Sequence, residues 1–319
     1  MDASTGRGLL SSEECDRRWR AYQLRDSRQA LMRQIRGFYS SLLGGITQDP
    51  AYFHIPIDDH GFHRGDGVFE AIRVAFRKPY LLGAHLDRLE RSAARVGLKL
   101  PHTRDEVKGI LHDLTRLAED ESLVLRVYVT RGGGGFGVNP AESPESQMFA
   151  VATRFQPLAP EVWEKGFALT VSPVAVKSGD FARIKSLNYL PNVLMKADAV
   201  ARGFDYAVGV DERGFITEGA TENIVIVNQN GDLCHPRFDR MLDGCTLKRA
   251  FELARGLPSL PQRCEVDLTL DDLMSAREIL IVGTTVDVSP ITRFEERPLA
   301  VGPVARELLR LIQTDQLRG

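Results

Sequence analysis

The chain has 319 residues, of which 43% are apolar and 26% charged, and its formal net charge is −2. This composition is typical of a soluble globular protein, and the length allows two domains. Without an excess of positive charge, nucleic acid is not an expected partner. No apolar run approaches the roughly 20 residues that a membrane-spanning helix needs, so we expect no membrane partner either.

The four cysteines are scattered along the chain without a CxxC pair. This spacing argues against a disulfide scaffold and against a zinc site. The histidines form no HExxH pattern, so we expect no bound metal. The N-terminal residues lack the apolar core of a secretion signal, and we expect a cytoplasmic protein.

The first half of the chain predicts helices and strands in alternation. Ser11 and Glu14 have capping-box spacing before a helix over residues 12–36. Strand patterns and amphipathic patterns follow. The sequence predicts strands over 67–74, 123–130 and 147–153, and helices over 82–96 and 104–118.

Pro157-Leu158-Ala159-Pro160 is the best candidate for a linker. Beyond it, short strands alternate with single helices, which indicates an α+β fold with many antiparallel pairs rather than regular βαβ units. The sequence predicts strands over 167–174, 206–211, 215–218, 223–227 and 278–282, and helices over 191–202 and 246–255. We expect an N-terminal helical extension (1–36), a small domain (37–153), a linker (154–162) and a larger domain (163–319).

Lys185 is the most informative residue. It stands in Ile184-Lys185-Ser186-Leu187-Asn188-Tyr189, just before a helix that Pro191 opens. A lysine in an exposed loop is usually only solvated, but the apolar and aromatic residues that follow favour a packed loop. An amine held in this way can form an imine with an aldehyde such as that of pyridoxal phosphate (PLP).

Glu218 follows in a strand, where alternation puts Ile216 and Glu218 on one face. A carboxylate on a buried face needs a partner. A salt bridge or an edge-strand position would satisfy it, and so would the protonated ring nitrogen of a PLP-like cofactor.

Two loops could hold a phosphate group. Asp243-Gly244-Cys245-Thr246 leads directly into a helix, whose N-terminal N–H groups attract anions. Gly283-Thr284-Thr285 ends an apolar strand with small hydrogen-bond donors. Arg88 could supply a cation, or could be an ordinary surface arginine.

Two further arginines are candidates for binding a substrate carboxylate. Arg126 lies within an apolar strand, and a buried arginine must be paired. Its partner could be a substrate or a structural carboxylate such as Glu70. Arg64 precedes the strand that carries Phe69, where it could bind an α-carboxylate or remain a loop charge.

Six sequence blocks together resemble one family, the class IV or fold type IV PLP enzymes. This family includes D-amino-acid transaminases, branched-chain aminotransferases and aminodeoxychorismate lyases. The resemblance runs from about Tyr39 to the C-terminus. The blocks occur in the family's order at residues 59–70, 85–89, 184–189, 217–219, 244–246 and 283–285.

The resemblance implies PLP as cofactor, amino acids and 2-oxo acids as substrates, and a homodimer. It also implies a small N-terminal α/β domain and a larger barrel-like domain with the cofactor between them. Lys185 would be the imine lysine and proton shuttle, Glu218 would pair with the pyridine nitrogen, and Tyr189 would lie near the ring hydroxyl. The expected phosphate-binding residues are Arg88, Gly244, Cys245, Thr246, Gly283 and Thr284. Phe69 and Thr285 would face the substrate, along with Arg64 or Arg126.

The subgroup is indicated by shorter stretches. Residues 39–46, 63–65 and 236–246 resemble the plant-type D-amino-acid aminotransferases, whereas 135–140 resembles branched-chain enzymes. Phe136 and Val138 stand where bacterial D-amino-acid transaminases carry an arginine and a histidine. We expect transamination of a D-amino acid. The alternatives are an aminodeoxychorismate lyase that eliminates pyruvate, a branched-chain L-amino-acid aminotransferase, and a catalytically silent binding protein.

Overall fold

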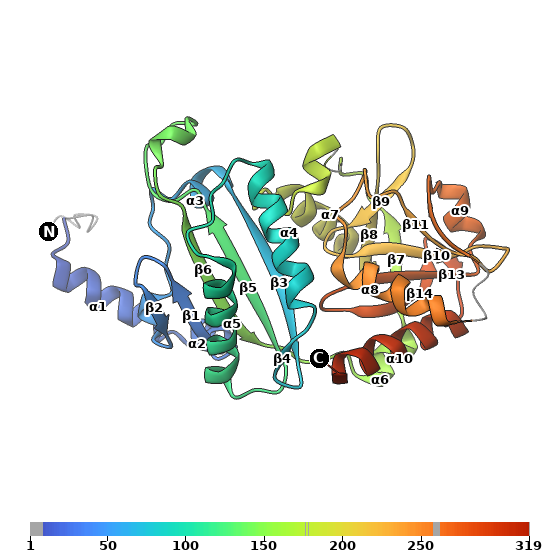
Figure 1. Cartoon of the computed structure of the whole chain (residues 1–319), viewed down its shortest axis with the longest axis horizontal. Coiled ribbons are helices and arrows are strands. Elements are labelled where there is room, and N and C mark those ends of the chain that lie inside the picture. Colours follow the sequence, from blue (N-terminus) through green and yellow to red (C-terminus); the bar gives the residue numbers. More distant parts are fainter. Residues whose placement is uncertain (1–8, 176, 178, 258–261, 319) are drawn as a thin grey trace, which may run out of the picture.

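The computed structural model describes residues 9–175, 177, 179–257 and 262–318. Within these ranges the chain forms two β-sheets whose faces are covered by helices (Figure 1). The α+β fold expected from the sequence is therefore confirmed. None of the helices in the described ranges combines the length and the apolar character that a membrane-spanning segment requires.

The first sheet contains six strands of the described chain in the order β2-β1-β6-β5-β3-β4, and each neighbouring pair is antiparallel. Its strands are β1 (Ile35–Ser40), β2 (Gly45–Thr47), β3 (Gly67–Ala75), β4 (Lys78–Pro79), β5 (Leu123–Thr130) and β6 (Gln147–Arg154).

The second sheet contains nine strands of the described chain in the order β12-β11-β10-β13-β14-β7-β8-β9, with β15 paired to β14. It mixes antiparallel pairs with the parallel pairs β11–β12, β14–β7 and β7–β8. Its strands are β7 (Phe167–Val171), β8 (Tyr206–Val210), β9 (Ile216–Gly219), β10 (Asn223–Val227), β11 (Leu233–Pro236), β12 (Arg263–Val266), β13 (Glu278–Gly283), β14 (Asp287–Phe294) and β15 (Arg297–Pro298).

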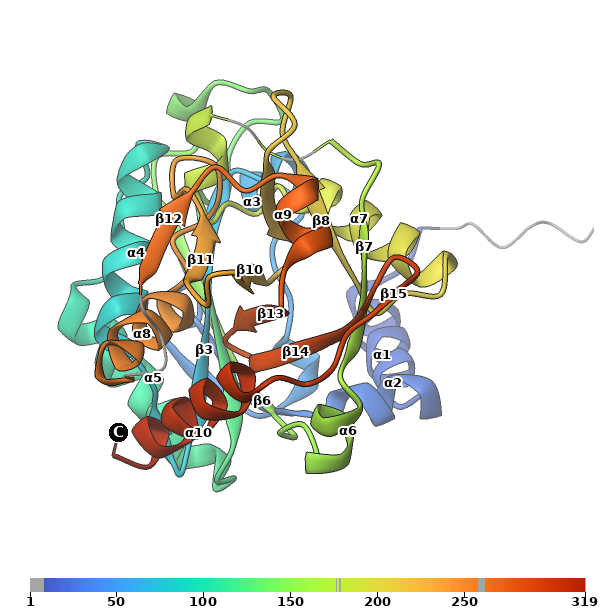
Figure 2. The same ribbon diagram turned by 90° about the vertical axis from the view of Figure 1, so that its right-hand side faces the viewer.

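The α-helices lie at the edges and on the faces of these sheets (Figure 2). They are α1 (Ser12–Gln23), α2 (Asp26–Met32), α3 (His60–Arg64), α4 (Leu82–Arg95), α5 (Arg104–Ala118), α6 (Pro160–Lys165), α7 (Leu190–Ala201), α8 (Cys245–Leu253), α9 (Leu270–Ser275) and α10 (Pro303–Arg318). Short 3-10 turns are η1 (Pro50–Tyr52), η2 (Pro140–Glu142), η3 (Gly179–Arg183) and η4 (Ala254–Gly256).

Side chains along β3 and β5 alternate between the two faces of the first sheet, and the two faces differ in composition. One face carries Ile72 and Leu125, which pack against Leu89 of α4 and Leu111 of α5 in a continuous core. Because neighbouring side chains point to opposite faces, the intervening residues of β3 and β5 point away from this core. The helices thus cover one face and leave the other for polar and aromatic side chains.

The second sheet curls around an interior of apolar side chains that include Ile224, Ile281 and Phe294. Its outer face is covered by α8 and α10, which contribute Leu247 and Leu308 to a separate core. Strands buried on both faces explain the nearly continuous apolar runs that the sequence shows at β10 and β13.

The N-terminal segment differs from the prediction of one helix over residues 12–36. The chain forms α1 and α2 instead, and Ile35 already belongs to β1. Only half of the expected capping box is present, because the Ser11 side chain accepts from the Glu14 N–H while Glu14 binds Arg17 and Arg18. The helical periodicity of residues 12–36 does not reveal that the last of them pair with other strands in the first sheet.

Residues 185–187, which precede α7, form backbone hydrogen bonds with the start of β3 in the first sheet. The N–H of Phe69 in β3 donates to Lys185 O at 2.9 Å, and the N–H of Leu187 donates to Gly67 O at 2.9 Å. This short ladder pairs the start of β3 with the segment that leads into α7. It fixes the backbone of Lys185 against the first sheet.

Gly67 permits this close approach. A Cβ atom at this position would lie 2.6 Å from Val129 O and 2.7 Å from Leu187 Cδ1. We predict that Gly67→Ala lowers the free energy of unfolding by about 1–3 kcal/mol, because the backbone must shift to admit the methyl group. Urea denaturation will measure the change.

Gly83→Ala is the matched control, since Gly83 lies in α4 and a Cβ there would have nothing within 4 Å. Alanine is favoured over glycine within a helix, so this variant should gain about 0.5–1 kcal/mol. Equal effects of the two substitutions would contradict the steric explanation.

Candidate active site

A cavity of about 320 Å³ lies where β3 and β5 of the first sheet meet β9, α8 and the β13–β14 turn of the second. We refer to it as the central cavity. It is lined by Phe69, Ala71, Arg88, Arg126, Lys185, Tyr189, Glu218, Ala220, Thr221, Asn223, Leu242, Gly244, Cys245, Thr246, Gly283, Thr284 and Thr285. The structure therefore brings together every residue that the sequence puts forward for the site except Arg64.

Lys185 is buried, and its amine lies among aromatic rings. Its Nζ donates a hydrogen bond to Tyr189 Oη at 3.2 Å and lies 4.6 Å from the centroid of the Phe69 ring. The Phe69 ring in turn packs edge-on against Tyr189 at 4.9 Å. These contacts orient a single amine toward the cavity, which is the arrangement that a covalent amine catalyst needs.

Glu218 comes from β9 and lines the same cavity. Its Oε2 accepts a hydrogen bond from the Leu242 N–H at 3.1 Å. Burial raises the pKa of the Glu218 carboxyl group to about 7, although the Leu242 N–H and the Lys185 and Lys177 amines oppose the shift. A carboxylate with this pKa is poised to share a proton with a basic ring nitrogen.

Arg88 belongs to a buried cluster at the other end of the cavity. Its guanidinium group holds the Glu70 carboxylate with two hydrogen bonds, at 2.7 and 2.8 Å, and His85 Nδ1 lies 2.8 Å from the same carboxylate. Burial alone would raise the pKa of Glu70, but Arg88 and His85 lower it to about 2. The third nitrogen of Arg88, Nη1, donates to Asp243 O at 3.2 Å.

The N-terminus of α8 lies beside Arg88. Gly244 precedes the helix, and no side chain caps the first N–H groups. The N–H groups of a helix N-terminus and a nearby guanidinium group together bind phosphate well. Thr246 and the turn that carries Thr284 add hydroxyl groups to the same cavity. The donors present therefore fit a phosphorylated pyridine with an aldehyde group, held between Arg88, Glu218 and Lys185.

Asn223 is a residue of the cavity that we did not single out from the sequence. Its Nδ2 donates to Leu242 O at 3.0 Å, and a side chain at Gly244 would collide with its amide. Asn223 thus braces the loop that leads into α8. In the sequence, the one feature that could have identified Asn223 is its position as the single polar residue of the apolar strand Asn223–Val227.

Arg126 faces the central cavity rather than Glu70. The register pairs Arg126 with Ala71, so Arg126 and Glu70 point to opposite faces of the first sheet. Arg126 Nη1 donates to Thr153 Oγ1 at 2.8 Å, and no carboxylate in the described ranges forms an ion pair with it. The alternative in which Glu70 is the structural partner of Arg126 is therefore wrong.

Arg64 does not reach the central cavity within this chain. Its guanidinium group donates to Gly137 O at 3.0 Å, to His63 O at 3.0 Å and to Phe136 O. The expected carboxylate anchor is instead bound to the backbone of the loop after β5. Sequence could not reveal this contact, because it depends on how a distant loop folds back over α3.

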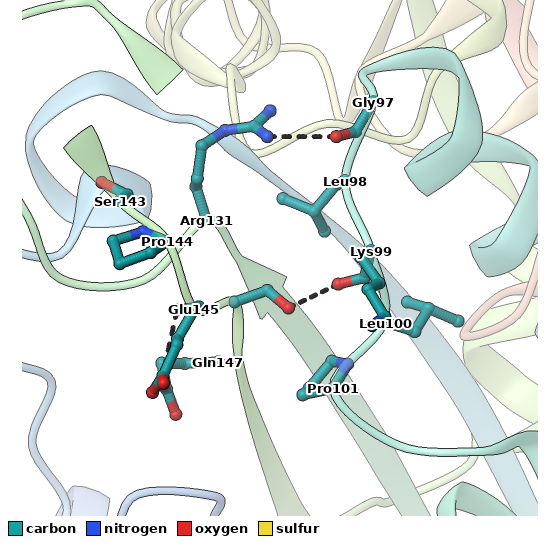
Figure 3. A pocket seen from close by; sticks show the side chains of 11 residues that line it. Gly97, Leu98, Lys99, Leu100, Pro101, Arg131, Ser143, Pro144, Glu145 and Gln147 are labelled. Atoms are coloured by element: carbon teal, nitrogen blue, oxygen red, sulfur yellow. Dashed lines mark hydrogen bonds between the residues drawn. The ribbon is translucent and has the colours of Figure 1, made fainter. Parts of the chain in front are cut away.

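Arg131 is also committed elsewhere, beside a separate cavity of about 440 Å³ (Figure 3). Its guanidinium group pairs with Asp66 at 2.7 Å and donates to Gly97 O at 3.2 Å. This second cavity shares no lining residue with the central one. Of the three arginines considered for the substrate carboxylate, Arg126 is the one that lines the central cavity.

Comparison with known proteins assigns the family. Residues 67–294 match amino-transferase class IV. The chain belongs to the class IV aminotransferases. This aminotransferase is 34% identical to the chloroplastic D-amino-acid transaminase of Arabidopsis thaliana, over 90% of this chain and 78% of that protein. It is 33% identical to a putative branched-chain-amino-acid aminotransferase of Methanocaldococcus jannaschii, over 83% of this chain and 92% of that protein.

Solved structures agree with the family. A branched-chain amino acid aminotransferase from T.th., solved with pyridoxamine 5'-phosphate, matches with a TM-score of 0.83 at 26% identity, covering 89% of this chain and 95% of that one. The branched-chain aminotransferase of Escherichia coli matches with a TM-score of 0.80 at 25% identity, covering 86% and 93%. This aminotransferase is a PLP-dependent enzyme, and the fold type expected from the sequence is confirmed.

The Glu70 cluster leads to a prediction about pH. The pKa of Glu70 is about 2 in the folded protein and near the ordinary 4.5 when unfolded, so its ion pair stabilises the fold above pH 4.5. That contribution, roughly 3 kcal/mol, is lost as the pH falls from 4.5 toward 2. Glu70→Gln should therefore be about 3–5 kcal/mol less stable at pH 7 and lose less stability on acidification.

Urea denaturation at a series of pH values from 7 to 3 tests this prediction. Glu307→Gln is the control, because Glu307 forms an exposed ion pair with Arg310 and should change stability by less than ~1 kcal/mol. A Glu70→Gln profile parallel to that of the parent protein would show that Glu70 does not control acid stability.

Proposed function

We propose that this enzyme transfers an amino group between a D-amino acid and a 2-oxo acid. The observation that carries the proposal is its 34% identity, over 90% of the chain, to a D-amino-acid transaminase. A 29% identity to the D-alanine aminotransferase of Bacillus licheniformis supports the same substrate class.

The residues of the central cavity have separate roles in the proposed transamination. Bound PLP supplies an aldehyde that reacts with amines and a ring that accepts electrons. Lys185 would hold the cofactor through its amine, and the same amine would move a proton to or from the substrate Cα. Glu218 would keep the ring nitrogen protonated, and Tyr189 orients the Lys185 amine through their 3.2 Å hydrogen bond.

Arg126 is our proposed anchor for the substrate carboxylate, in place of Arg64. Its guanidinium group lines the central cavity, and its hydrogen bond to Thr153 leaves further N–H donors for a ligand. A carboxylate that enters a partly dry cavity needs such a charged partner. Phe69 and Thr285 would complete the substrate side of the cavity.

A branched-chain L-amino-acid aminotransferase is the second candidate. It is favoured by the 33% identity to the relative from Methanocaldococcus jannaschii, whose name carries that activity. The two candidates differ in which face of the substrate Cα is presented to Lys185. Lys185 would have the same role in both candidate enzymes, so only the identity of the substrate distinguishes the two activities.

We also propose that two domains, residues 37–153 and 163–319, hold the cofactor between them in a homodimer. Exposed apolar side chains support a partner copy, among them Phe62 of α3, Val138 of the loop after β5, and Leu190 and Val193 of α7. These elements lie on the same side of the molecule in Figure 1. Such side chains are commonly buried in a subunit interface.

Lys185→Ala should remove the absorbance band of covalently held cofactor and reduce turnover by at least about 10²–10⁴-fold, because no other amine lines the central cavity within the described ranges. Absorbance spectra and steady-state rates measure both effects. Lys196→Ala, on the exposed side of α7, is the control and should keep both. Retention of the band by Lys185→Ala would refute the role of Lys185.

The substrate class is tested by single-turnover reactions with matched D- and L-amino acids. We expect D-amino acids to convert the cofactor band to its amine form at least about tenfold faster than their L-enantiomers. Conversion by L-leucine or L-valine alone would favour the branched-chain candidate. Release of pyruvate from aminodeoxychorismate without transamination would identify a lyase.

Arg126→Met should raise KM for the amino acid about ten- to a hundredfold, since a charge-assisted hydrogen bond contributes about 1.5–3 kcal/mol. The absorbance of bound cofactor should not change. Arg64→Met is the matched control, because Arg64 binds backbone carbonyl groups and not the cavity. A larger KM effect at Arg64 than at Arg126 would return the anchor to Arg64, acting outside its own chain's cavity.

A further inference from the structure

Lys177 is a second lysine beside the active site that the chemistry above does not use. It lies in the segment between β7 and η3, and its Nζ is 4.6 Å from the centroid of the Tyr189 ring. The Nζ of Lys185 is 5.6 Å from the same centroid. Two amines from different segments thus approach one aromatic ring, and only one of them lines the central cavity.

A second, much smaller cavity connects Lys177 with Glu218. This rear cavity has a volume of about 20 Å³ and is lined by Lys177, Pro191, Asn192, Met195, Thr217, Glu218, Gly219 and Arg240. A space of this size holds about one water molecule. The charges of Lys177 and Glu218 therefore act on each other with little solvent between them.

Glu218 is the only residue that lines both the central and the rear cavity within the described chain. It shares the central cavity with Lys185 and Arg88, and the rear cavity with Lys177 and Arg240. The guanidinium group of Arg240 pairs with Asp211 at 3.3 Å and with Asp267 at 2.6 Å. Apart from the Leu242 N–H, the cations Lys185, Lys177 and Arg88 are the groups that favour the charged form of the Glu218 carboxyl group.

Glu218 is the only carboxylate among the described residues that line the rear cavity with Lys177. Among the residues that the structure describes, no carboxylate forms an ion pair with Lys177, and its contacts are the Tyr189 ring and the rear cavity. Burial lowers the pKa of the Lys177 amine, the charge of Glu218 raises it, and the charge of Lys185 lowers it. Lys177 and Glu218 thus stabilise each other's charged forms.

We propose that Lys177 is a positioning residue whose charge, placed behind Glu218, keeps the Glu218 carboxyl group ionised while its other side faces the cofactor ring. The proposal rests on the role assigned to Glu218 above. A less basic carboxylate leaves the shared proton on the ring nitrogen. Lys177 therefore supports the electron-accepting form of the ring without touching the cofactor or the substrate.

The test is the titration of Glu218 in the cofactor-free protein, followed by ¹³C NMR of glutamate-labelled samples. The signal of Glu218 is identified as the one missing from Glu218→Gln. In Lys177→Met, the titration should move to higher pH, so that the ionised fraction at pH 7 falls about three- to tenfold. Lys177→Arg keeps the charge and should restore the parent titration.

Lys196→Met is the matched control, because the Nζ of Lys196 lies 4.5 Å above another tyrosine ring, that of Tyr206, away from both cavities. An unchanged Glu218 titration in Lys177→Met, or an equal shift in Lys196→Met, would overturn the proposal. Lys177→Gln serves as a second neutral variant, and melting temperatures establish that each protein is folded.

The loaded enzyme supplies an independent readout. Lys177→Met should slow the single-turnover reaction while KM for the amino acid stays within about twofold, since Lys177 does not line the central cavity. A shifted titration in Lys177→Met combined with a fully active Glu218→Gln would preserve the link between Lys177 and Glu218. That combination would instead refute the role of Glu218 at the ring nitrogen.

Discussion

The pairing of β3 with residues 185–187 is the contact on which the site depends. Two backbone hydrogen bonds of 2.9 Å tie the first sheet to the segment that enters α7. The first sheet contributes Phe69, Ala71 and Arg126 to the cavity, and β9, α8 and the β13–β14 turn contribute much of the rest. This pairing holds the Lys185 carbonyl group against β3, while the Lys185 N–H donates to Ser92 Oγ of α4 at 3.2 Å. The absence of a side chain at Gly67 is the local condition that allows it.

Two glutamates in the same region show how environment sets the chemistry of one residue type. Glu70 is held by Arg88 and His85, and its pKa falls to about 2. Glu218 has only a backbone N–H as a hydrogen-bond donor in the described chain, and burial raises its pKa to about 7. A carboxylate that is hydrogen-bonded to cations stabilises the fold, whereas a carboxylate that accepts only a backbone N–H is available to a cofactor. The difference between the two supports binding of a protonated ring at Glu218.

The substrate side is built differently from the cofactor side. The proposed cofactor-binding residues come from strand ends, a helix N-terminus and a turn, each of which has a recognisable local sequence. The substrate side depends on which arginine remains open after the others are bound. Arg64 is held by a loop backbone and Arg131 by Asp66, which leaves Arg126. This outcome follows from packing.

The sequence by itself determined the family, the α+β class and most of the residues that meet in the central cavity. Lys185, Glu218 and the Gly-Thr turns could be recognised because their chemistry depends on short segments with strong local signals. The tertiary structure alone decided three things: the division of residues 12–36 into two helices and a strand, the partner of Glu70, and the presence of Arg126 rather than Arg64 in the central cavity. Each depends on strand register or on contacts between distant segments. The alternation of apolar and polar residues predicts to which face of its strand a side chain points. It does not predict which residue of another segment that side chain contacts.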